Sequence, residues 1–566
     1  MIFRRPIVSA ILVGLVTLAV FLPSLNNGFV NWDDLSNLVN NPGFRGFSWD
    51  HLHWMWTNQL TSHYIPLTWM SFGLDYGIWK EHAVGYHLTN VLLHAANAAV
   101  FFLLALAIFK RAFWRPEVQS EAPLVCGAGL ASLLFSLHPL RVESVAWATE
   151  RRDVLSGLFF LLALLIYVHA FPAEPKGSMP RKSYLICLAL FAMSILSKEI
   201  AVTLPFVLLI LDVYPLRRLP GPSGWFGPDA RRVWFEKIPF FAVGLADGAV
   251  ALHAGIRDHL VEPVAVLGLA ARIAITVYGM AFYLLKTVVP IGLSPLYPLT
   301  RYKAALGAMP FQMSATVVLL ITLICVVLRH RFPGLAAAWT ASAVILLPVS
   351  GIIHNGFQIA ADRYTYLACL SWALLAGAGF IFGWRALRHS STGRALTATG
   401  AVLALCTLSY LSYSQIAIWH DSDTLWSRAI AVEPSVPAHL NFAASLYNEG
   451  NTLGAIDQYR QAIVLWPDNA GIHTMLGGAL LDMHQGEEAA KEFRLAVQIG
   501  PNPDAFNGLT YALVMQGKLD EAIGVLSAEL RRNPGDTDAR RNLRVISAMK
   551  ESHEQNGSQI LARESK

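Results

Sequence analysis

Residues 87–109 read HLTNVLLHAANAAVFFLLALAIF, an almost uncharged stretch long enough to cross the hydrocarbon core of a bilayer. Backbone amides and carbonyls find no water in lipid, so such a stretch must form a helix. Eleven further apolar runs occur between residues 7 and 414. The first, 7–25, is longer than the apolar core of a typical signal peptide, and we interpret it as a retained helix. The sequence therefore predicts an all-α, polytopic membrane helix bundle.

Charge is divided unevenly along the chain. Hydrophobic residues make up 54% of the sequence and charged residues 14%, against about 25% charged in a soluble globular protein. Residues 420–566 carry 19 acidic and 13 basic side chains, whereas residues 1–419 carry 19 acidic and 30 basic ones. The basic excess follows the membrane topology, so it does not predict nucleic acid as a partner.

Lysine and arginine are concentrated in short connectors between the apolar runs, for example at 217–237 and 385–394. Such connectors remain in the cytoplasm. The long segment 26–86 has only Arg45 and Lys80, so we expect it to lie on the other side of the membrane. The segments 138–153 and 351–364 and everything after residue 415 are expected to be external too.

The apolar runs that follow residue 237 do not match the pattern of basic connectors. Lys237 and Arg329 are both predicted to be cytoplasmic, which requires an even number of crossings between them. Three apolar runs lie there, 238–256, 272–290 and 311–329, so one of them must not cross. The sequence predicts about eleven crossings in all.

Prolines recur regularly near the C-terminus, at Pro434, Pro467, Pro501 and Pro534, with spacings of 33, 34 and 33 residues. This period, with small and large residues at fixed places between the prolines, is typical of tetratricopeptide repeats. Small residues allow the helices to pack closely, and proline ends the second helix of each pair. The matching positions include Ala443, Gly450, Ala455, Tyr459 and Ala462, then Gly477, Ala489, Phe493 and Ala496, then Tyr511, Gly517, Ala522 and Leu526. We expect a membrane domain over 1–414, an α-solenoid of repeats over 415–545 and a disordered polar tail over 546–566.

Two adjacent carboxylates, Asp33 and Asp34, follow the first apolar run closely. At the membrane edge one of them can have a raised pKa and act as a general base. The alternative is that they cap a short helix, since aspartate is a good N-cap.

The next external segment is rich in titratable residues. Ionisable groups at a membrane edge indicate a functional site, and the alternative is an ion-pair network that only braces the bundle. The candidates in this segment are His138, Arg141, Glu143, Glu150, Arg151, Arg152 and Asp153.

Two smaller groups add to these candidates, Lys198-Glu199 and Asp362-Arg363-Tyr364. The planar guanidinium of Arg363 suits a phosphate, although it could also anchor the membrane interface by pairing with Asp362. Histidines such as His63, in the first external segment, lack the spacing of a metal site and are interpreted as surface or packing residues. His87 and His94, on the run 87–109, are interpreted as interhelical hydrogen-bond partners.

Six strings of residues in this order, followed by the repeats, resemble the transmembrane and tetratricopeptide repeat-containing proteins. They are NGFVNWDD (27–34), YIPLT (64–68), HLTNVLLH (87–94), HPLRVESVAWATERRDVLS (138–156), LSKEIAVTLP (196–205) and ADRYTYLACLSW (361–372). That family is similar to the C-type (GT-C) glycosyltransferases, and its animal members are protein O-mannosyltransferases with many more repeats.

The resemblance implies a polyprenyl-phosphate-linked sugar as donor and transfer on the outer face of the membrane. It makes Asp33 or Asp34 the general base, and Arg363, Lys198 and Arg141 the contacts of the donor phosphate. The repeats would then bind the acceptor or a partner protein. No cofactor is required by the sequence, which leaves room for a divalent metal.

The alternative function is a membrane transporter or a membrane-anchored repeat scaffold without catalysis. We expect a multi-pass protein of the plasma or inner membrane in a bacterium, or of the endoplasmic reticulum in a eukaryote, with the repeats outside the cytoplasm. The two functions differ in whether Asp33, Glu143, Lys198 and Arg363 converge on one outward-facing pocket.

Overall fold

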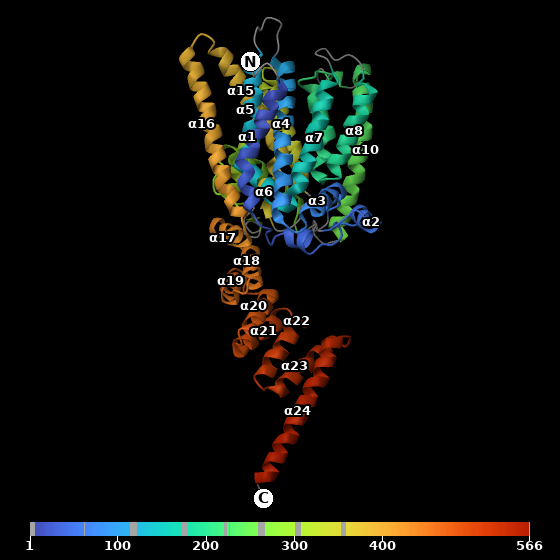
Figure 1. Cartoon of the computed structure of the whole chain (residues 1–566), viewed down its shortest axis with the longest axis vertical. Coiled ribbons are helices and arrows are strands. Elements are labelled where there is room, and N and C mark those ends of the chain that lie inside the picture. The colour runs from blue at the N-terminus through green and yellow to red at the C-terminus, as the bar shows by residue number, and fades with distance from the viewer. Residues whose placement is uncertain are drawn as a thin grey trace. The chain divides into compact units, whose positions relative to one another are not determined.

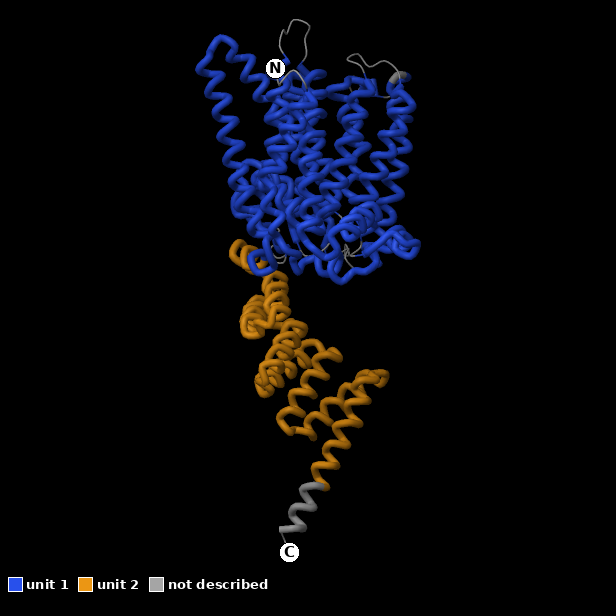
Figure 2. The backbone as a smooth tube through the Cα atoms, viewed as in Figure 1, with its two compact units in different colours: residues 1–425 blue, residues 426–566 orange. Residues whose placement is uncertain are grey.

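The computed structural model describes residues 6–60, 63–113, 121–171, 178–219, 224–225, 227–257, 267–299, 307–352 and 358–564. The chain forms two compact units, residues 1–425 and 426–566 (Figure 2). The first unit extends past the expected boundary at 414 because the chain after α16 (Ser391–Ile416) is tied to the segment that follows α1 (Pro6–Phe21). The backbone N–H of Gly28 donates to the carbonyl of His420 at 2.8 Å, and that of Asn31 donates to Ser422 Oγ at 2.9 Å.

Helices account for almost all of the regular structure in the described part of the first unit, and the predicted all-α class is confirmed. The remaining α-helices are α2 (Trp49–Thr57), α3 (Pro66–Trp79), α4 (Ala83–Phe113), α5 (Ala122–Ser136), α6 (Val142–Ala146), α7 (Arg151–His169), α8 (Arg181–Ile195), α9 (Leu204–Val213), α10 (Pro228–Arg257), α11 (Leu269–Val288), α13 (Met309–Leu328), α14 (Pro333–Leu346) and α15 (Thr365–Ala386). Short 3-10 or π turns that bear on the site are η3 (Leu35–Val39), η4 (Pro139–Arg141), η5 (Ala148–Glu150), η6 (Glu199–Thr203), η8 (Leu347–Val349) and η9 (Asp362–Tyr364). Strands β1 (Tyr297–Pro298) and β2 (Gln358–Ala360) pair antiparallel.

The centre of this unit is built by α4, α5, α7 and α15, which lie against one another (Figure 1). A Cβ atom on Gly127 of α5 would lie 2.5 Å from Ile381 Cγ1 and 2.9 Å from the carbonyl oxygen of Gly377, both on α15. Glycine is therefore required for the two backbones to approach so closely, as is common between membrane helices.

Buried polar groups of α4 hold neighbouring elements. His94 Nδ1 lies 2.8 Å from the Tyr366 hydroxyl on α15, and its Nε2 lies 3.0 Å from the carbonyl oxygen of Ser136 on α5. His87 Nε2 lies 3.3 Å from the carbonyl oxygen of Gly28. For His94 the interpretation as an interhelical partner is confirmed, and His87 plays the same part toward a loop.

Among the described residues, eight helices are long and apolar enough to cross a membrane, or nine if the bent pair α5–α6 is one span. These are two or three fewer than the eleven crossings expected. The apolar runs at 183–197, 200–214 and 335–353 form the shorter helices α8, α9 and α14, of 15, 10 and 14 residues. At 1.5 Å per residue, the ten residues of α9 cover only about half of a hydrocarbon core roughly 30 Å thick.

Helix α11 touches the same end of the bundle with both of its ends. That end is marked by Arg151 at the start of α7, and the opposite end by Tyr167, which donates to Asp212. Near its start, Thr276 donates to the carbonyl of Ser350, beyond the C-terminus of α14. Near the C-terminus of α11, the carbonyl oxygen of Thr287 lies 3.0 Å from His138 Nε2. Since His138 follows α5 toward the Arg151 end, α11 fits the expectation that one run between Lys237 and Arg329 does not cross.

We predict that both ends of α11 are reached from one side of the membrane. Leu269 and Val288 lie at the two ends of α11, with side chains 62% and 78% exposed. The side from which each is reached can therefore be tested with single cysteines, in a background without the five native ones, and a membrane-impermeant maleimide. Labelling of the two sites from one side is expected. Cysteines at Met309 and Arg329, which bracket α13, should be labelled from opposite sides. Labelling of Leu269 and Val288 from opposite sides would show that α11 crosses.

The second unit consists of helix pairs with the predicted period. Its helices are α17 (Ser422–Val432), which begins in the first unit, α18 (Val436–Asn448), α19 (Thr452–Leu465), α20 (Ala470–Asp482), α21 (Gly486–Ile499), α22 (Pro503–Met515), α23 (Leu519–Arg532) and α24 (Thr537–Glu564). The turns within the first and third pairs place Gly450 and Gly517 at φ +81° and +72°, where glycine is favoured. A Cβ on Gly477 would lie 2.9 Å from the ring of Phe493, so these two predicted positions fit each other.

Helix α24 runs through most of the stretch 546–566, where we expected a disordered tail. Lys550 contributes to this, because its Nζ lies 2.5 Å from Asp520 Oδ1 on α23 and 3.6 Å from Glu554 Oε1 one turn further along.

Candidate active site

The adjacent carboxylates Asp33 and Asp34 have different surroundings. The side chain of Asp33 is 28% exposed, and its Oδ2 lies 3.9 Å from Arg152 Nη2. Asp34 is fully buried. Of the two, only Asp33 can meet a substrate in this structure.

Asp34 fastens the segment after α1 to η5. Its Oδ1 accepts hydrogen bonds from the backbone N–H and the hydroxyl of Thr149, at 2.9 and 2.5 Å, and its Oδ2 accepts one from the N–H of Val30 at 3.0 Å. The side chain does not cap η3, so the helix-cap interpretation is wrong for Asp34. Burial, opposed by these hydrogen bonds, raises the pKa of Asp34 to about 7.

The raised pKa of Asp34 predicts that stability falls as the pH rises from about 4 to about 7. In this window the folded chain holds a proton on Asp34 that the unfolded chain releases, so folding is favoured at the lower pH and the advantage is lost by pH 7. The effect should be at most about 4 kcal/mol, taking roughly 1.4 kcal/mol per pKa unit. The melting temperature of wild type should fall relative to that of Asp34→Asn across this window, because the neutral variant lacks the titration. Parallel pH profiles would contradict the raised pKa.

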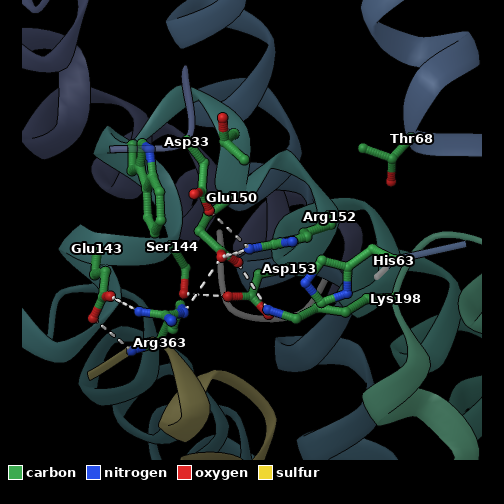
Figure 3. A network of polar contacts seen from close by, with 12 residues as sticks. Asp33, His63, Thr68, Glu143, Ser144, Glu150, Arg152, Asp153, Lys198 and Arg363 are labelled. Atoms are coloured by element: carbon green, nitrogen blue, oxygen red, sulfur yellow. Dashed lines mark hydrogen bonds and ion pairs between the residues drawn. The ribbon is translucent and has the colours of Figure 1, made fainter. Parts of the chain in front are cut away.

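A buried ionic network surrounds Glu150, at the start of α7 (Figure 3). Glu150 Oε1 lies 2.5 Å from Arg152 Nη2, and Oε2 lies 2.8 Å from Lys198 Nζ. Arg363 Nε lies 3.4 Å from Oε1. Three cations from three separate parts of the chain therefore share one carboxylate, which is itself fully buried.

Two further carboxylates extend this network. Lys198 Nζ also lies 2.8 Å from Asp153 Oδ1, and Asp153 Oδ2 accepts a hydrogen bond from the Ser144 hydroxyl at 2.8 Å. Arg363 forms an ion pair with Glu143 through Nη1, and its backbone N–H donates to Glu143 Oε2 at 2.9 Å. Arg363 is thus paired with Glu143 and Glu150, and not with Asp362 as the interface-anchor alternative supposed.

The four residues expected to converge on an outward-facing pocket are linked through Glu150 in a buried network of ion pairs. Asp33 meets Arg152, Glu143 meets Arg363, and both cations meet Glu150 together with Lys198. We call this set the Glu150 cluster; its members are Asp33, Glu143, Glu150, Arg152, Asp153, Lys198 and Arg363. Side-chain exposure is 8% or less for all of them but Asp33, so Asp33 forms the open edge of the cluster.

Several predicted site residues point elsewhere. Arg151 donates to Asp75 at 2.6 Å and to the carbonyl of Tyr86 at 2.8 Å, so it braces α3 and α4. Neighbouring residues on a helix point in directions about 100° apart, which separates Arg151 from Arg152.

Arg141 is fully buried, donates to the Thr365 hydroxyl, and has its guanidinium over the rings of Phe135 and Tyr366 at 5.6 and 5.5 Å. No hydrogen bond or ion pair joins it to the Glu150 cluster, but its Nε and Nη1 have no hydrogen-bond partner among the described residues, so its contact with a donor phosphate stays a prediction. The same prediction stands for Arg363 and Lys198, and Arg152 is a further candidate.

The other candidates surround the cluster without entering it. Asp362 accepts a hydrogen bond from the Tyr297 hydroxyl at 3.0 Å, and Tyr364 places its ring 5.1 Å from the guanidinium carbon of Arg363. His138 is bound to Thr287, as described above. Glu199 Oε1 lies 3.2 Å from His63 Nδ1.

Sequence reasoning missed His63 and Ser144. His63 belongs to the first external segment and contacts the neighbour of Lys198, 136 residues later in the chain. Ser144 lies between two titratable candidates but carries no charge, so the charge pattern that drew attention to Glu143 passed over it.

Candidate metal ligands are not grouped together in the part of the chain that the structure describes. No group of three or more His, Cys, Asp or Glu side chains there could hold a metal ion. The cations of the Glu150 cluster already face its carboxylates. The arrangement of the Glu150 cluster supports proton abstraction at Asp33 and stabilisation of a nearby anion by arginine and lysine.

Known proteins match the chain over most of its length. A family model described as tetratricopeptide repeat matches residues 440–504 and 474–537. Protein O-mannosyl-transferase TMTC4 of Mus musculus is 26% identical over 80% of this chain and 66% of its own. Protein O-mannosyl-transferases TMTC3 and TMTC1 of Homo sapiens are 23% and 25% identical, over 87% and 80% of this chain and 55% and 54% of their own.

The predicted resemblance is confirmed. The chain is similar to transmembrane and tetratricopeptide repeat-containing proteins that are named O-mannosyl-transferases, and its apolar helices fit a multi-pass membrane protein. It spans between about half and two thirds of the length of these relatives.

Proposed function

We propose that this protein is a membrane glycosyltransferase of the GT-C type, which transfers a sugar from a polyprenyl-phosphate carrier to a hydroxyl group of a protein. The observation that supports this best is the convergence of Asp33 with Arg152, Lys198 and Arg363 around Glu150. The names of the relatives favour mannose as the sugar.

The proposed reaction is a displacement at the anomeric carbon of the sugar. The acceptor oxygen forms a bond to this carbon while the bond from the carbon to the phosphate oxygen breaks. Asp33 takes the proton of the acceptor hydroxyl, and the polyprenyl phosphate leaves with one additional negative charge. Asp33 suits this role because its carboxylate stays partly exposed at the edge of the cluster.

The leaving phosphate requires positive charge near its oxygens. Arg363, Lys198 and Arg152 are the proposed source, and all three contact Glu150. Because each cation already has a carboxylate partner, we expect the phosphate to take over some of the contacts that Glu150 now makes. A bidentate phosphate contact favours the two arginines over lysine.

Asp34 is assigned a positioning role. Its bonds to Thr149 hold the segment that carries Asp33 against η5, whose last residue is Glu150. In this way Asp34 sets the place of the base without meeting the substrate.

The Glu150 cluster would face the side of the membrane away from the cytoplasm, since Asp33, Glu143 and Arg363 lie in the segments 26–86, 138–153 and 351–364 that are expected to be external. We place the repeats on that side too, as the binding unit for the acceptor or a partner protein. The membrane would be the plasma or inner membrane in a bacterium and the endoplasmic reticulum in a eukaryote.

A transfer assay tests this function. Purified full-length protein in lipid nanodiscs should move sugar from one member of a panel of polyprenyl-phosphate sugars to a serine- and threonine-containing acceptor. Asp33→Asn serves as the inactive control. No transfer with any donor of the panel, by protein whose folding is verified, would contradict the proposal.

A further inference from the structure

A buried carboxylate on α10, Asp247, is not used by the proposed reaction. It is 9% exposed, and its Oδ2 has no hydrogen-bond partner within the described ranges. A buried polar atom without a partner costs free energy, so it is a candidate for contact with a ligand.

Asp247 lies on the face of α10 that packs against η6. At Gly244 the helix comes so close that a Cβ there would lie 3.2 Å from Val202 Cγ2 and 3.8 Å from the carbonyl oxygen of Val202. Asp247 follows Gly244 by three residues and therefore shares its face. It is near enough to Glu199, the first residue of η6, and to Tyr64 to interact electrostatically with both.

The segment from His63 to Thr68 is hydrogen-bonded to residues just before η6 and within it. Leu67 N–H donates to the carbonyl of Leu196 at 3.1 Å, and the Thr68 hydroxyl donates to that of Ser197 at 2.9 Å. Glu199 Oε1 lies 3.2 Å from His63 Nδ1 and accepts a bond from the N–H of Tyr64 at 3.3 Å.

Glu199 carries a negative charge. Burial raises its pKa, but His63 and the hydrogen bonds outweigh burial and lower it to about 2. Its side chain is 20% exposed and that of His63 is 34% exposed, so both remain within reach of a ligand.

This group lies beside the Glu150 cluster. Glu199 directly follows Lys198, whose ammonium contacts Glu150 and Asp153. Figure 3 shows His63 next to Lys198, at the end of the network away from Glu143. A molecule held at both places would have its anionic part near Lys198 and another part near Glu199.

The ionised carboxylate of Glu199 accepts hydrogen bonds, so a ligand that contacts it must either donate a hydrogen bond or be a cation. The ligands that fit are the hydroxyl groups of a sugar, which donate hydrogen bonds, or a divalent cation, which a carboxylate coordinates. The described residues offer no set of three ligands for a metal, which favours hydroxyl groups. An imidazole beside the carboxylates adds a group that can donate to or accept from a hydroxyl.

We propose that Asp247, Glu199 and His63 form the subsite that holds the sugar hydroxyl groups of the donor. This inference rests on the proposed function, since it assumes a sugar-phosphate lipid as the donor. The phosphate would then lie toward Lys198 and the sugar hydroxyls toward α10.

The test compares two lipids on the full-length protein in phosphatidylcholine nanodiscs, with thermal stabilisation as the readout. One lipid is polyprenyl-phosphate mannose, and the other is polyprenyl phosphate without sugar. Asp247→Asn and Glu199→Gln should weaken binding of the mannosyl lipid by about ten- to a hundredfold, the range for hydrogen bonds to charged groups. Binding of the bare lipid phosphate should change less than about twofold, within the scatter of such single contacts.

Glu81→Gln is the control variant. It removes an exposed carboxylate, 62% accessible, and should leave both affinities unchanged. His63→Gln is a second test, usable even where Asp247→Asn does not fold, because this side chain is one-third exposed; it should show the same selective loss of the mannosyl lipid.

Other outcomes separate the two proposals. Equal losses for both lipids, or no loss for the mannosyl lipid, would overturn the sugar subsite. Stabilisation of wild type, but not of Asp247→Asn, by magnesium or manganese alone would assign these carboxylates to a cation instead. If wild type binds neither lipid, the proposed function itself fails.

Discussion

We expect Asp33→Asn to lower the turnover of sugar transfer by roughly 10²- to 10⁴-fold, the usual contribution of a positioned general base. The amide has nearly the same size but cannot accept the proton of the acceptor hydroxyl. Because Asp33 is partly exposed and its contact with Arg152 is long, at 3.9 Å, folding and donor binding should change little. Turnover, donor affinity and melting temperature should therefore be measured on the same preparation.

Asp34→Asn is the matched control, since it makes the same chemical change one residue along the chain. Its amide NH2 would face a backbone N–H or the Thr149 hydroxyl that now donates to Asp34. We expect lower stability at acidic pH and a smaller loss of turnover than for Asp33→Asn. Folded Asp33→Asn with wild-type turnover would remove Asp33 as the base. Equal losses of turnover and stability in both variants would instead favour a structural role for the pair.

The sequence predicts the classes of structure here better than the directions of side chains. Apolar length and the proline period are properties of whole segments, and they identify the bundle and the repeats. Asp33 and Asp34, or Arg151 and Arg152, are neighbours with the same charge that differ only in where the backbone points them. That direction depends on contacts such as the one between Asp34 and Thr149, which are 115 residues apart.

The Glu150 cluster was partly predictable for the same reason. Charged residues at a membrane edge must find partners, so Glu143, Glu150, Lys198 and Arg363 could be selected as a group. Arg141 is also a charged residue at the membrane edge, but its guanidinium lies over the rings of Phe135 and Tyr366. Asp247 could not be selected in this way, because a single carboxylate within an apolar run has no charged neighbours in the sequence. Only the packing of α10 on η6 brings it near Glu199.

Glu150→Gln should lower the stability of the first unit strongly. Glu150 is fully buried and is the shared partner of Arg152, Lys198 and Arg363. The amide would leave three buried cations with less negative charge and would turn an N–H2 group toward one of them. Removing one partner of a buried ion pair costs about 3–5 kcal/mol. The melting transition of the membrane unit is the quantity to follow, since we expect the repeats to unfold in a separate step.

Glu488→Gln in the second unit is the matched control, because Glu488 forms an exposed ion pair with Arg460 and its loss should cost no more than about 1 kcal/mol. The double variant Glu150→Gln/Lys198→Met tests the cause directly. If uncompensated positive charge is what destabilises Glu150→Gln, removing one cation should restore part of the lost stability, although it removes a second contact. If the double variant is less stable than Glu150→Gln, packing and hydrogen-bond geometry hold the cluster together more strongly than the balance of charge around Glu150 does.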